Sequence, residues 1–533
     1  VNDRGVVYAA VETVFEDGVA FEATLRPEGW ATEGAPDVEG FIGGFGSLRC
    51  DDPFLERYYD YRLYGLHLCR VGGGAGDAGA GNVRHPAVAE GIAYFHVPIT
   101  YSAQCHMLEA RWSRDPSVAR GTLLNFLEHQ REDGSLHGRI YASELVKTDF
   151  YHANWGDAVL AVEALHPDEA YLARVYPGLS RYADWLSRDR DADGSGMIDV
   201  VNHYETGQEY MSRYQAVNPN ADRDEWKSTT RLKAIDATVY SYQLRRALER
   251  IALRLGRSDE AARWGAEAAH VGRAIRERMW NEELRFFTDV DPRTGRSTGV
   301  KAAVCFYPML TDLVDEATVG DLLRRLTNPG EFWTPWPVPS SSVDDPCFNA
   351  EAEWKGKRHV CPWNGRVWPM TNSHVVEGLL RQWRLRAPDA GEDAPRVRCG
   401  AIAGELLDKF VKLMFHDREL GIAHARPNCF EHYNPYTGHA CVYRGIDDYQ
   451  HSWVADLLIR GLAGLDVEAD AASPGGARLV VDPLPMAAGD VRLVDQHVRG
   501  RRVDLERRGD RVSVWIDGDR YEGVVGAPLR IAL

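Results

Sequence analysis

The chain has 533 residues, of which 44% are hydrophobic and 26% charged, and its formal net charge is -17 at pH 7. This length predicts one large domain with smaller appendages, or several average ones. The negative charge excludes nucleic acid and anionic membranes as favoured partners, because phosphate groups would be repelled over most of the surface. No apolar run reaches the roughly 18 residues of a membrane span. A neutral or cationic ligand suits this chain better.

The cysteines and aromatic residues bear on the compartment and on the ligand. The 9 cysteines are odd in number, scattered and without a CxxC pair. They predict reduced thiols in a cytoplasmic protein, with neither a zinc site nor a disulfide framework. The chain also has 15 Trp and 23 Tyr, an aromatic content that a large ligand cleft would help to explain.

In chain order, a short β region comes first, then a long helical region, then a small β region. Residues 6–25 alternate in polarity around a Glu-Asp-Gly turn, which predicts a β-hairpin. Helical spacing follows, interrupted by a flexible Gly-rich connector at 72–81 and by Gly, Pro, Asp and Asn clusters. The predicted helices are 53–69, 99–112, 116–131, 155–165, 169–187, 229–255, 258–281, 311–327, 369–386, 397–415 and 447–464.

This order predicts a mainly α fold. Helices that pair through loops, with no strand pattern between them, favour an (α/α)6 toroid of helical hairpins over a βα barrel. After Asp470, alternating segments with Arg-Gly-Asp and Asp-Gly turns indicate strands. The predicted domains are 1–50 (N-terminal β region), 51–468 (helical catalytic domain) and 469–533 (C-terminal β domain).

The segment 428–453, NCFEHYNPYTGHACVYRGIDDYQHSW, places one carboxylate, Glu431, among aromatic and amide side chains. Aromatic rings stack on the apolar faces of a sugar, while amides and carboxylates bind its hydroxyl groups. A hydrogen-bonded loop between helices is the competing interpretation. The candidate site residues that follow Glu431 are Tyr433, Asn434, Tyr449 and His451.

A second acidic cluster lies in the segment 189–214, DRDADGSGMIDVVNHYETGQEYMSRY. Hydrolysis of a glycosidic bond needs one protonated carboxyl for the leaving oxygen and one carboxylate to activate water or attack the sugar. Two acids on distant loops meet this need when the loops share one end of a toroid. Taken alone, Glu205 or Glu209 is more often a salt-bridging acid. The other candidate ligand-binding residues here are Gln208 and Arg213.

The string CPWNGRVWPMTNS, residues 361–373, is the most distinctive one. Trp363 and Trp368 flank Asn364 and Arg366, and Pro369 stands where a helix would start. Stacking indoles and a guanidinium donor suit a sugar subsite. Two Trp plugging the toroid would explain the indoles but not the polar residues between them.

Further candidates are weighed against structural roles. Trp155 and Asp157 open a helix and could bind substrate hydroxyl groups, although Asp157 equally suits a helix N-terminus. Trp226, Lys227 and Asp236 are candidates for the cleft, with Lys227 suited to a substrate carboxylate. A solvated surface lysine is the commoner alternative.

The run of Asp189, Asp191 and Asp193 followed by Gly194 matches the first half of a calcium-binding loop. Val200 stands where such loops carry their final Glu. We therefore weigh a structural Ca²⁺ ion against an Asx-rich turn. The sequence calls for no other cofactor.

The strings PWNGRVWPMTNSHVVEGLL, FEHYNPYTG and DYQHSWVADLLIRGLAGL, in this order, resemble the six-hairpin glycosidases of glycoside hydrolase family 63 and the mannosylglycerate hydrolase type. The resemblance spans roughly Pro53 to Leu465. It implies an (α/α)6 toroid that hydrolyses α-glycosidic bonds with inversion. ETGQEYMS matches the general-acid segment with Glu209 in the usual Asp place, and the general base falls on Glu431.

The chain departs from this family at one motif. Relatives carry a WxWD string whose acid holds the sugar, but the comparable stretch reads FHVPITYSAQCHMLEARW, so Tyr101, Ser102 and Gln104 would have to replace it. The sequence thus predicts an inverting, exo-acting hydrolase of a small α-linked glycoside or oligosaccharide. The alternatives are a polysaccharide lyase with Tyr101 and His106 at a basic centre, and a silent sugar-binding protein with its two acids far apart.

Overall fold

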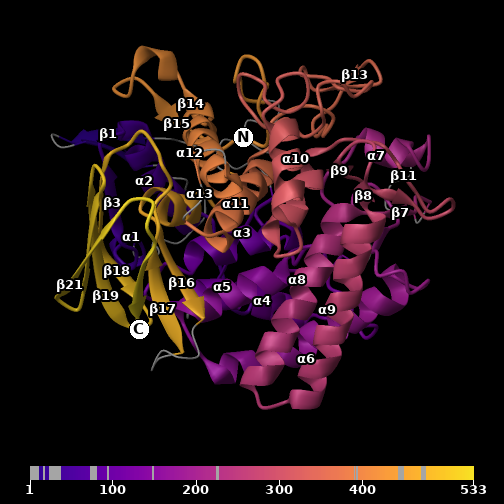
Figure 1. Ribbon diagram of the computed structural model, residues 1–533, viewed down its shortest axis with the longest axis horizontal. Helices are drawn as coiled ribbons and strands as arrows, with labels where there is room; N and C mark the ends of the chain where they lie inside the picture. Colours follow the sequence, from indigo (N-terminus) through magenta and orange to yellow (C-terminus); the bar gives the residue numbers. More distant parts are fainter. Residues whose placement is uncertain are drawn as a thin grey trace.

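The computed structural model describes residues 11–15, 18–22, 38–72, 81–92, 95–146, 149–223, 227, 229–388, 391, 394–441, 449–469 and 476–533. Helices make up the main body, and antiparallel sheets pack against one side of it (Figure 1). None of the helices in these ranges is long and apolar enough to cross a membrane.

The helices follow the predicted segments closely. Their bounds are α1 (Val38–Ile42), α2 (Pro53–Leu68), α3 (Thr100–Ala110), α4 (Ser117–Glu128), α5 (Trp155–Leu165), α6 (Glu169–Trp185), α7 (Ser212–Gln215), α8 (Ile235–Arg254), α9 (Ser258–Arg278), α10 (Glu316–Leu326), α11 (Pro369–Leu385), α12 (Pro395–Leu413) and α13 (Val454–Leu457). A π-helical turn, Leu458–Leu462, extends α13. Every predicted helix overlaps an observed one.

Three predicted helices begin later than expected, and local contacts explain two of the differences. Leu232–Lys233 forms strand β7, so α8 begins at Ile235 rather than at 229. The carboxylate of Asp315 accepts a hydrogen bond from the Thr318 amide (2.7 Å) and caps α10, which begins at Glu316 rather than at 311. The last helix begins at Val454 rather than at 447, and residues 442–448 lie outside the described ranges.

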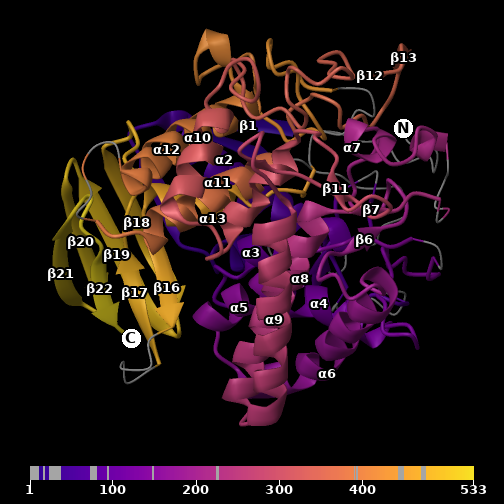
Figure 2. The same ribbon diagram turned by 45° about the vertical axis from the view of Figure 1, so that its right-hand side comes forward.

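Burial separates inner helices from outer ones. Every residue of α3 is buried, and α8 and α11 are buried on nearly all sides. By contrast, α9 buries one face only, against α8. The 3-10 segment Ala303–Leu310 packs between α8 and α11, and its Pro308 disrupts the regular helical pattern that the sequence analysis relied on. Figure 2 shows α9 on the outside of the helical body.

The strands form two-stranded ladders, one four-stranded sheet in the loops, and two sheets near the end of the chain. In the loops the strands are β4 (Arg70–Val71), β5 (Ala87–Val88), β6 (Asp199–Val200), β7 (Leu232–Lys233), β8 (Trp280–Asn281), β9 (Phe286–Phe287), β10 (Val290–Asp291), β11 (Arg296–Ser297), β12 (Glu353–Trp354), β13 (Lys357–Arg358), β14 (Phe415–His416) and β15 (Arg426–Pro427). The predicted N-terminal hairpin is confirmed as β1 (Val11–Phe15) paired with β2 (Gly18–Glu22).

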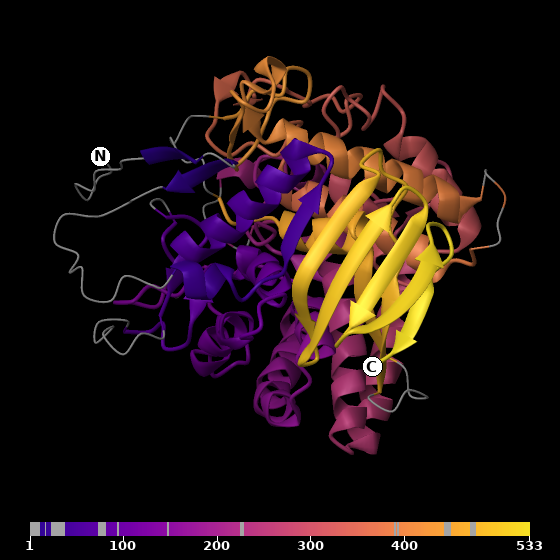
Figure 3. The ribbon, with the colours of Figure 1, turned by 90° about the vertical axis from the view of Figure 1, so that its left-hand side faces the viewer.

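The C-terminal strands are confirmed, and a strand from the N-terminal region joins them. One sheet contains β16 (Leu465–Ala469), β17 (Ala477–Val481) and β22 (Leu529–Ala532). The other contains β18 (Asp490–Val498), β19 (Arg501–Arg508), β20 (Arg511–Ile516) and β21 (Asp519–Val524). β3 (Ser47–Cys50) pairs antiparallel with β18 at the edge of this second sheet (Figure 3). The first and last predicted domains therefore share a sheet.

Candidate active site

A cavity of about 370 Å³ lies among loops from widely separated parts of the chain. The described residues that line it are Glu90, Phe95, Ile99, Tyr101, Arg139, Tyr151, Tyr204, Gly207, Glu209, Tyr210, Val360, Cys361, Trp363, Trp368, Glu431, Tyr449 and His451. They include both predicted catalytic acids and both Trp residues of the predicted sugar subsite. The hairpins β12–β13 and β14–β15, from the same long loops, project from the top of the molecule in Figure 1.

Glu209 and Glu431 approach each other through one thiol. The Sγ atom of Cys361 lies 3.3 Å from Oε2 of Glu209 and 3.5 Å from Oε1 of Glu431. These two oxygen atoms are therefore at most about 7 Å apart. Inverting glycosidases separate their carboxyl groups by about 6.5–9.5 Å and retaining ones by about 5–5.5 Å, and this upper limit is compatible with both. The structure brings the two predicted acids into one cavity.

Backbone hydrogen bonds hold the three loops in register. The amide of Trp363 donates to the carbonyl of Glu209 (3.0 Å), and Val367 and Tyr433 exchange two backbone hydrogen bonds of 2.9 Å. The Trp loop thus joins the Glu209 loop on one side and the Glu431 loop on the other. Gly207 makes the Glu209 turn possible, because its φ is +66° and an added Cβ would lie 2.8 Å from the ring of Tyr101.

Aromatic rings form one wall of the cavity. Trp363 and Trp368 stack with ring centroids 3.6 Å apart and an interplanar angle of 11°. The Tyr101 ring meets Trp363 edge-on at 6.3 Å. Such a surface suits the apolar faces of a sugar ring.

Three buried polar atoms of uncharged side chains on the cavity lining lack a hydrogen-bond partner in the part of the chain that the structure describes. They are the Tyr101 hydroxyl, Nε1 of Trp363 and Nε2 of His451, and the three side chains are at most 7% exposed. Burial raises the pKa of Tyr101 well above its usual value and lowers that of His451 to about 3, so both are neutral at physiological pH. Buried polar groups are normally paired, so these atoms point to a polar ligand.

The carboxylate of Glu431 accepts a hydrogen bond from one of the candidate residues that follow it in the chain. Tyr433 donates its single hydroxyl proton to Oδ1 of Asn428 (2.7 Å), and the Asn434 amide donates to Ala350 and Glu351. Neither bond reaches Glu431. The hydroxyl of Tyr449 instead donates to Oε1 of Glu431 at 3.3 Å. Tyr449 therefore lies beside the predicted base.

Several predicted ligand-binding residues form ion pairs away from the cavity. Glu205 pairs with Arg190 (2.7 Å) and accepts from the Val201 amide. Arg213 is fully buried and bridges Asp236 (2.9 Å) to Asp289 (2.7 Å). Their charged groups are satisfied by one another, which is the usual condition for charges inside a protein. The structure does not bring them to the cavity lining.

The remaining predicted residues lie in three kinds of place. The Asn364 amide donates to the carbonyls of Cys347 and Glu353, and Arg366 donates to Nδ1 of His432, so both fasten loops. Outside the described cavity lining, Gln208 and Trp155 are buried, and the half-buried Asp157 pairs with Arg381 at 2.7 Å. Lys227 is exposed, and Trp226 lies outside the described residues.

The predicted calcium loop contains a lysine amine. Nζ of the buried Lys233 lies 2.8 Å from Asp193 and 3.8 Å from Asp191, while Asp189 pairs with Arg188. Within the described ranges, no group of three or more His, Cys, Asp or Glu side chains is placed to hold a metal ion. The calcium site stays a prediction, which equilibrium dialysis against a chelator would test.

Sequence reasoning missed part of the cavity wall. Glu90 is 6% exposed and follows β5, and Arg139 pairs with Asp149 (3.1 Å) and donates to the Tyr151 hydroxyl (2.7 Å). Cys361 was noted only as the first letter of the Trp string. Glu90 and Arg139 stand in segments without a motif, and nothing in the Trp string marks Cys361 as a contact of the two acids, so spacing carried no signal. Only the fold brings them to the catalytic acids.

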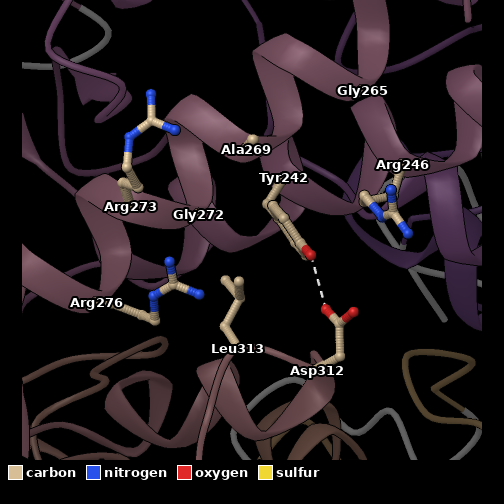
Figure 4. Close-up of a pocket in the computed structure, with 9 residues that line it drawn as sticks. All are labelled: Tyr242, Arg246, Gly265, Ala269, Gly272, Arg273, Arg276, Asp312 and Leu313. Carbon is tan, nitrogen blue, oxygen red and sulfur yellow. Dashed lines mark hydrogen bonds between the residues drawn. The ribbon is translucent and has the colours of Figure 1, made fainter. Parts of the chain in front are cut away.

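A second cavity, of about 390 Å³, lies between α8, α9 and the loop before α10 (Figure 4). Arg246, Arg273 and Arg276 surround it, and the Tyr242 hydroxyl donates to Asp312 at 2.7 Å. Asp312 is the sole carboxylate among its described lining residues. It therefore lacks the two facing acids that glycoside hydrolysis requires.

Comparisons with known proteins agree with the reaction class that the two acids of the cavity suggest. The family model of the mannosylglycerate hydrolase MGH1-like glycoside hydrolase domain matches residues 97–452. A probable mannosyl-oligosaccharide glucosidase of Schizosaccharomyces pombe is 22% identical over 322 residues, 58% of this chain and 37% of the yeast protein. The chain thus spans well under half of that relative.

Solved structures share the fold. A glycoside hydrolase family 63 mannosylglycerate hydrolase from Thermus thermophilus, in complex with glucose, superposes with a TM-score of 0.55 at 16% identity, covering 75% of this chain and 99% of that one. A structure named sialidase superposes with a TM-score of 0.74 at 17% identity, covering 93% of this chain and 42% of that one.

Proposed function

Because the chain belongs to the mannosylglycerate hydrolase MGH1-like glycoside hydrolase family and is therefore an O-glycosyl hydrolase, we propose that it cleaves a small α-linked glycoside with inversion. Glu209 is the general acid and Glu431 the general base. The helical body is, in this proposal, the (α/α)6 toroid that the sequence predicts, and no cofactor takes part in the reaction.

The proposed reaction needs one proton donor and one proton acceptor. The Glu209 carboxyl gives its proton to the glycosidic oxygen as the bond from that oxygen to the anomeric carbon breaks. A water molecule attacks the anomeric carbon from the opposite face while Glu431 removes its proton. The products are a free sugar of inverted configuration and an alcohol, and solvent resets both carboxyl groups.

The contact of Cys361 with both carboxylates is the observation that carries this proposal. It supports two acids facing one space from separate loops, as the reaction requires. Tyr449 supports the role of Glu431, because a hydrogen bond donated to the ionised form favours a carboxylate over a carboxylic acid.

The size of the cavity supports a small substrate. Its volume of about 370 Å³ is near the lower end of the range of roughly 300–1,000 Å³ for small-molecule sites. Stacked indoles on one wall and three unpartnered polar atoms fit one sugar ring with a small aglycone. We therefore propose exo-action on an α-glucoside or α-mannoside.

The two alternative classes fit the cavity less well. A lyase requires a basic centre, yet His106 is buried outside the described lining with Nε2 bonded to the Gln450 carbonyl (2.6 Å). Burial also lowers the pKa of His106 to about 3. A silent binding protein would hold Glu209 and Glu431 far apart, whereas one sulfur atom contacts both.

The decisive experiment is hydrolysis of p-nitrophenyl α-glucoside and α-mannoside, followed by NMR of the first sugar released. We expect the β-anomer to appear before mutarotation. Release of the α-anomer would contradict inversion. The Glu431→Gln variant should bind sugar and unfold like the wild type but lose turnover, and near-normal activity would remove Glu431 from the mechanism.

A further inference from the structure

We propose that Glu90 is a third functional carboxylate, which binds hydroxyl groups of the sugar and restricts the cavity to uncharged sugar rings. This inference rests on the proposed function only in taking the cavity as the place where the sugar binds. It assigns a specificity role to a residue outside all of the motifs that identify the catalytic acids.

The backbone fixes Glu90 against the segment that carries the partner of the base. The Glu90 carbonyl accepts a hydrogen bond from the Gln450 amide at 2.7 Å, between Tyr449 and His451. The Glu90 amide donates to the Val97 carbonyl at 3.2 Å. Glu90 thus keeps a set position relative to Tyr449, which in turn bonds Glu431. A sugar contact made by Glu90 would orient the anomeric carbon toward the base.

The polar groups on the lining complement hydroxyl groups. An ionised carboxylate only accepts hydrogen bonds and an indole N–H only donates them, whereas a hydroxyl group does both. The neutral Tyr101 and His451 complete a set of donors and acceptors that a sugar diol can satisfy at once. Because Glu90 is 6% exposed, a contact there would be made largely out of water, where charged hydrogen bonds are stronger.

The charges on the same lining oppose an anionic sugar. The lining carries the carboxylates of Glu90 and Glu431, because the proposed acid Glu209 is protonated; Arg139 is the sole cation among the described lining residues, and His451 is neutral. Arg139 already pairs with Asp149 at 3.1 Å. A uronate ring would add a carboxylate to a buried space with an excess of carboxylates, and this is costly at short range in a low dielectric.

The test compares Glu90→Gln with a matched control, Glu163→Gln. Glu163 is similarly buried, at 7% exposure, but pairs with Arg254 (3.1 Å) outside the described cavity lining. D-Glucose and D-mannose binding is measured by calorimetry, and KM and kcat with neutral p-nitrophenyl α-glycosides. We expect Glu90→Gln to weaken the binding of the better-bound sugar and to raise KM, each by about 10- to 100-fold. This is the change expected when a hydrogen bond to a charged group is lost. Glu163→Gln should leave both unchanged.

Selectivity supplies a second readout. The wild type should cleave p-nitrophenyl α-glucuronide at least 100-fold more slowly than the better neutral glycoside. Glu90→Gln should lower this ratio of cleavage rates. Folded Glu90→Gln protein with unchanged sugar affinity, KM and selectivity would overturn the proposal. If Glu90→Gln does not fold, Glu90→Asp should weaken sugar binding several-fold, and unchanged binding would overturn it equally.

Failure of the catalytic assignment would look different. Sugar binding is measured without turnover, so it tests Glu90 even if Glu431→Gln proves active. Conversely, an inactive Glu431→Gln with unaltered Glu90→Gln binding would keep the proposed function and remove only the role of Glu90.

Discussion

Two groups of carboxylates have opposite surroundings. Asp236 and Asp289 both bond Arg213, and all three side chains are at most 3% exposed. Glu209 and Glu431 instead meet a thiol, and Glu431 a phenol, at the edge of a cavity. The first arrangement neutralises charge and stabilises the fold. The second leaves carboxylates facing space that a substrate can fill, which is where functional acids are found.

Electrostatics make the same distinction. Burial alone would raise the pKa of Asp236, but the guanidinium of Arg213 outweighs it and holds that pKa below the usual value. The Asp236 carboxylate therefore stays ionised and cannot donate a proton. Although the sequence made Arg213 and Asp236 candidates for substrate binding, their mutual pairing indicates a structural role.

The largest expected effect separates the two catalytic acids. Glu209→Gln and Glu431→Gln should each lower kcat for a p-nitrophenyl α-glycoside by about 10²- to 10⁴-fold, the usual contribution of a general acid or base. A dinitrophenyl glycoside has a leaving group that needs little protonation. It should therefore restore the kcat of Glu209→Gln far more than that of Glu431→Gln. Equal restoration of both variants would contradict the assignment of acid and base.

The next effect is on stability alone. Arg213→Met leaves Asp236 and Asp289 buried without their cation, so the free energy of unfolding should fall by about 3–5 kcal/mol. Urea denaturation followed by fluorescence measures it. The exposed Arg273→Met, on the outer cavity of Figure 4, is the control and should change stability by less than about 0.5 kcal/mol. A small loss in Arg213→Met would show that the ion-pair group is dispensable.

A buried histidine predicts how stability depends on pH. Nδ1 of His374 donates to the Met370 carbonyl (2.9 Å) and Nε2 accepts from Tyr240 (2.7 Å), and burial lowers the pKa of His374 to about 4. Below pH 6.5 this histidine binds a proton in the unfolded chain, whereas in the folded chain it stays neutral down to about pH 4. Stability should therefore fall as the pH drops, by roughly 2 kcal/mol from this residue between pH 6.5 and 5. The slope of the unfolding free energy over this pH range should be smaller in His374→Gln, and an unchanged slope would contradict this.

The smallest effect concerns Tyr449. Removing its hydroxyl in Tyr449→Phe takes away the hydrogen bond to Glu431, and kcat should fall about 10-fold, with KM nearly constant. Tyr242→Phe removes a hydroxyl that bonds Asp312 on the outer cavity and should leave kcat unchanged. A larger rise in KM than fall in kcat would make Tyr449 a sugar contact rather than a positioning residue.

The sequence predicted features that depend on neighbouring residues. Every helix predicted from periodicity overlaps an observed one. The strings around Glu431 and Trp363 identified two loops of the cavity. The local pattern could not separate Glu205 from Glu209, which stand four residues apart, and only the family resemblance favoured Glu209 as the acid. The turn at Gly207 sends one carboxylate to Arg190 and the other into the cavity, and only the fold decides which goes where.

Long-range contacts were beyond reach for the same reason. Glu90, Arg139 and Cys361 meet only because their loops converge, and no spacing in the chain encodes that meeting. The position of β3 is a similar case, since four residues of strand pattern do not name a partner in the last part of the chain. Local patterns predict elements, whereas tertiary packing selects the members of a site.

The pairing of β3 with β18 has a consequence for synthesis on the ribosome. β3 emerges early, but its partner emerges only after the whole helical body, on the order of tens of seconds later at typical elongation rates. During that interval the Gly46 amide also lacks its acceptor, Oε1 of Gln496 (3.2 Å). A nascent chain therefore carries an open strand edge until the final sheet forms, and this is the step at which a chaperone would have most to protect.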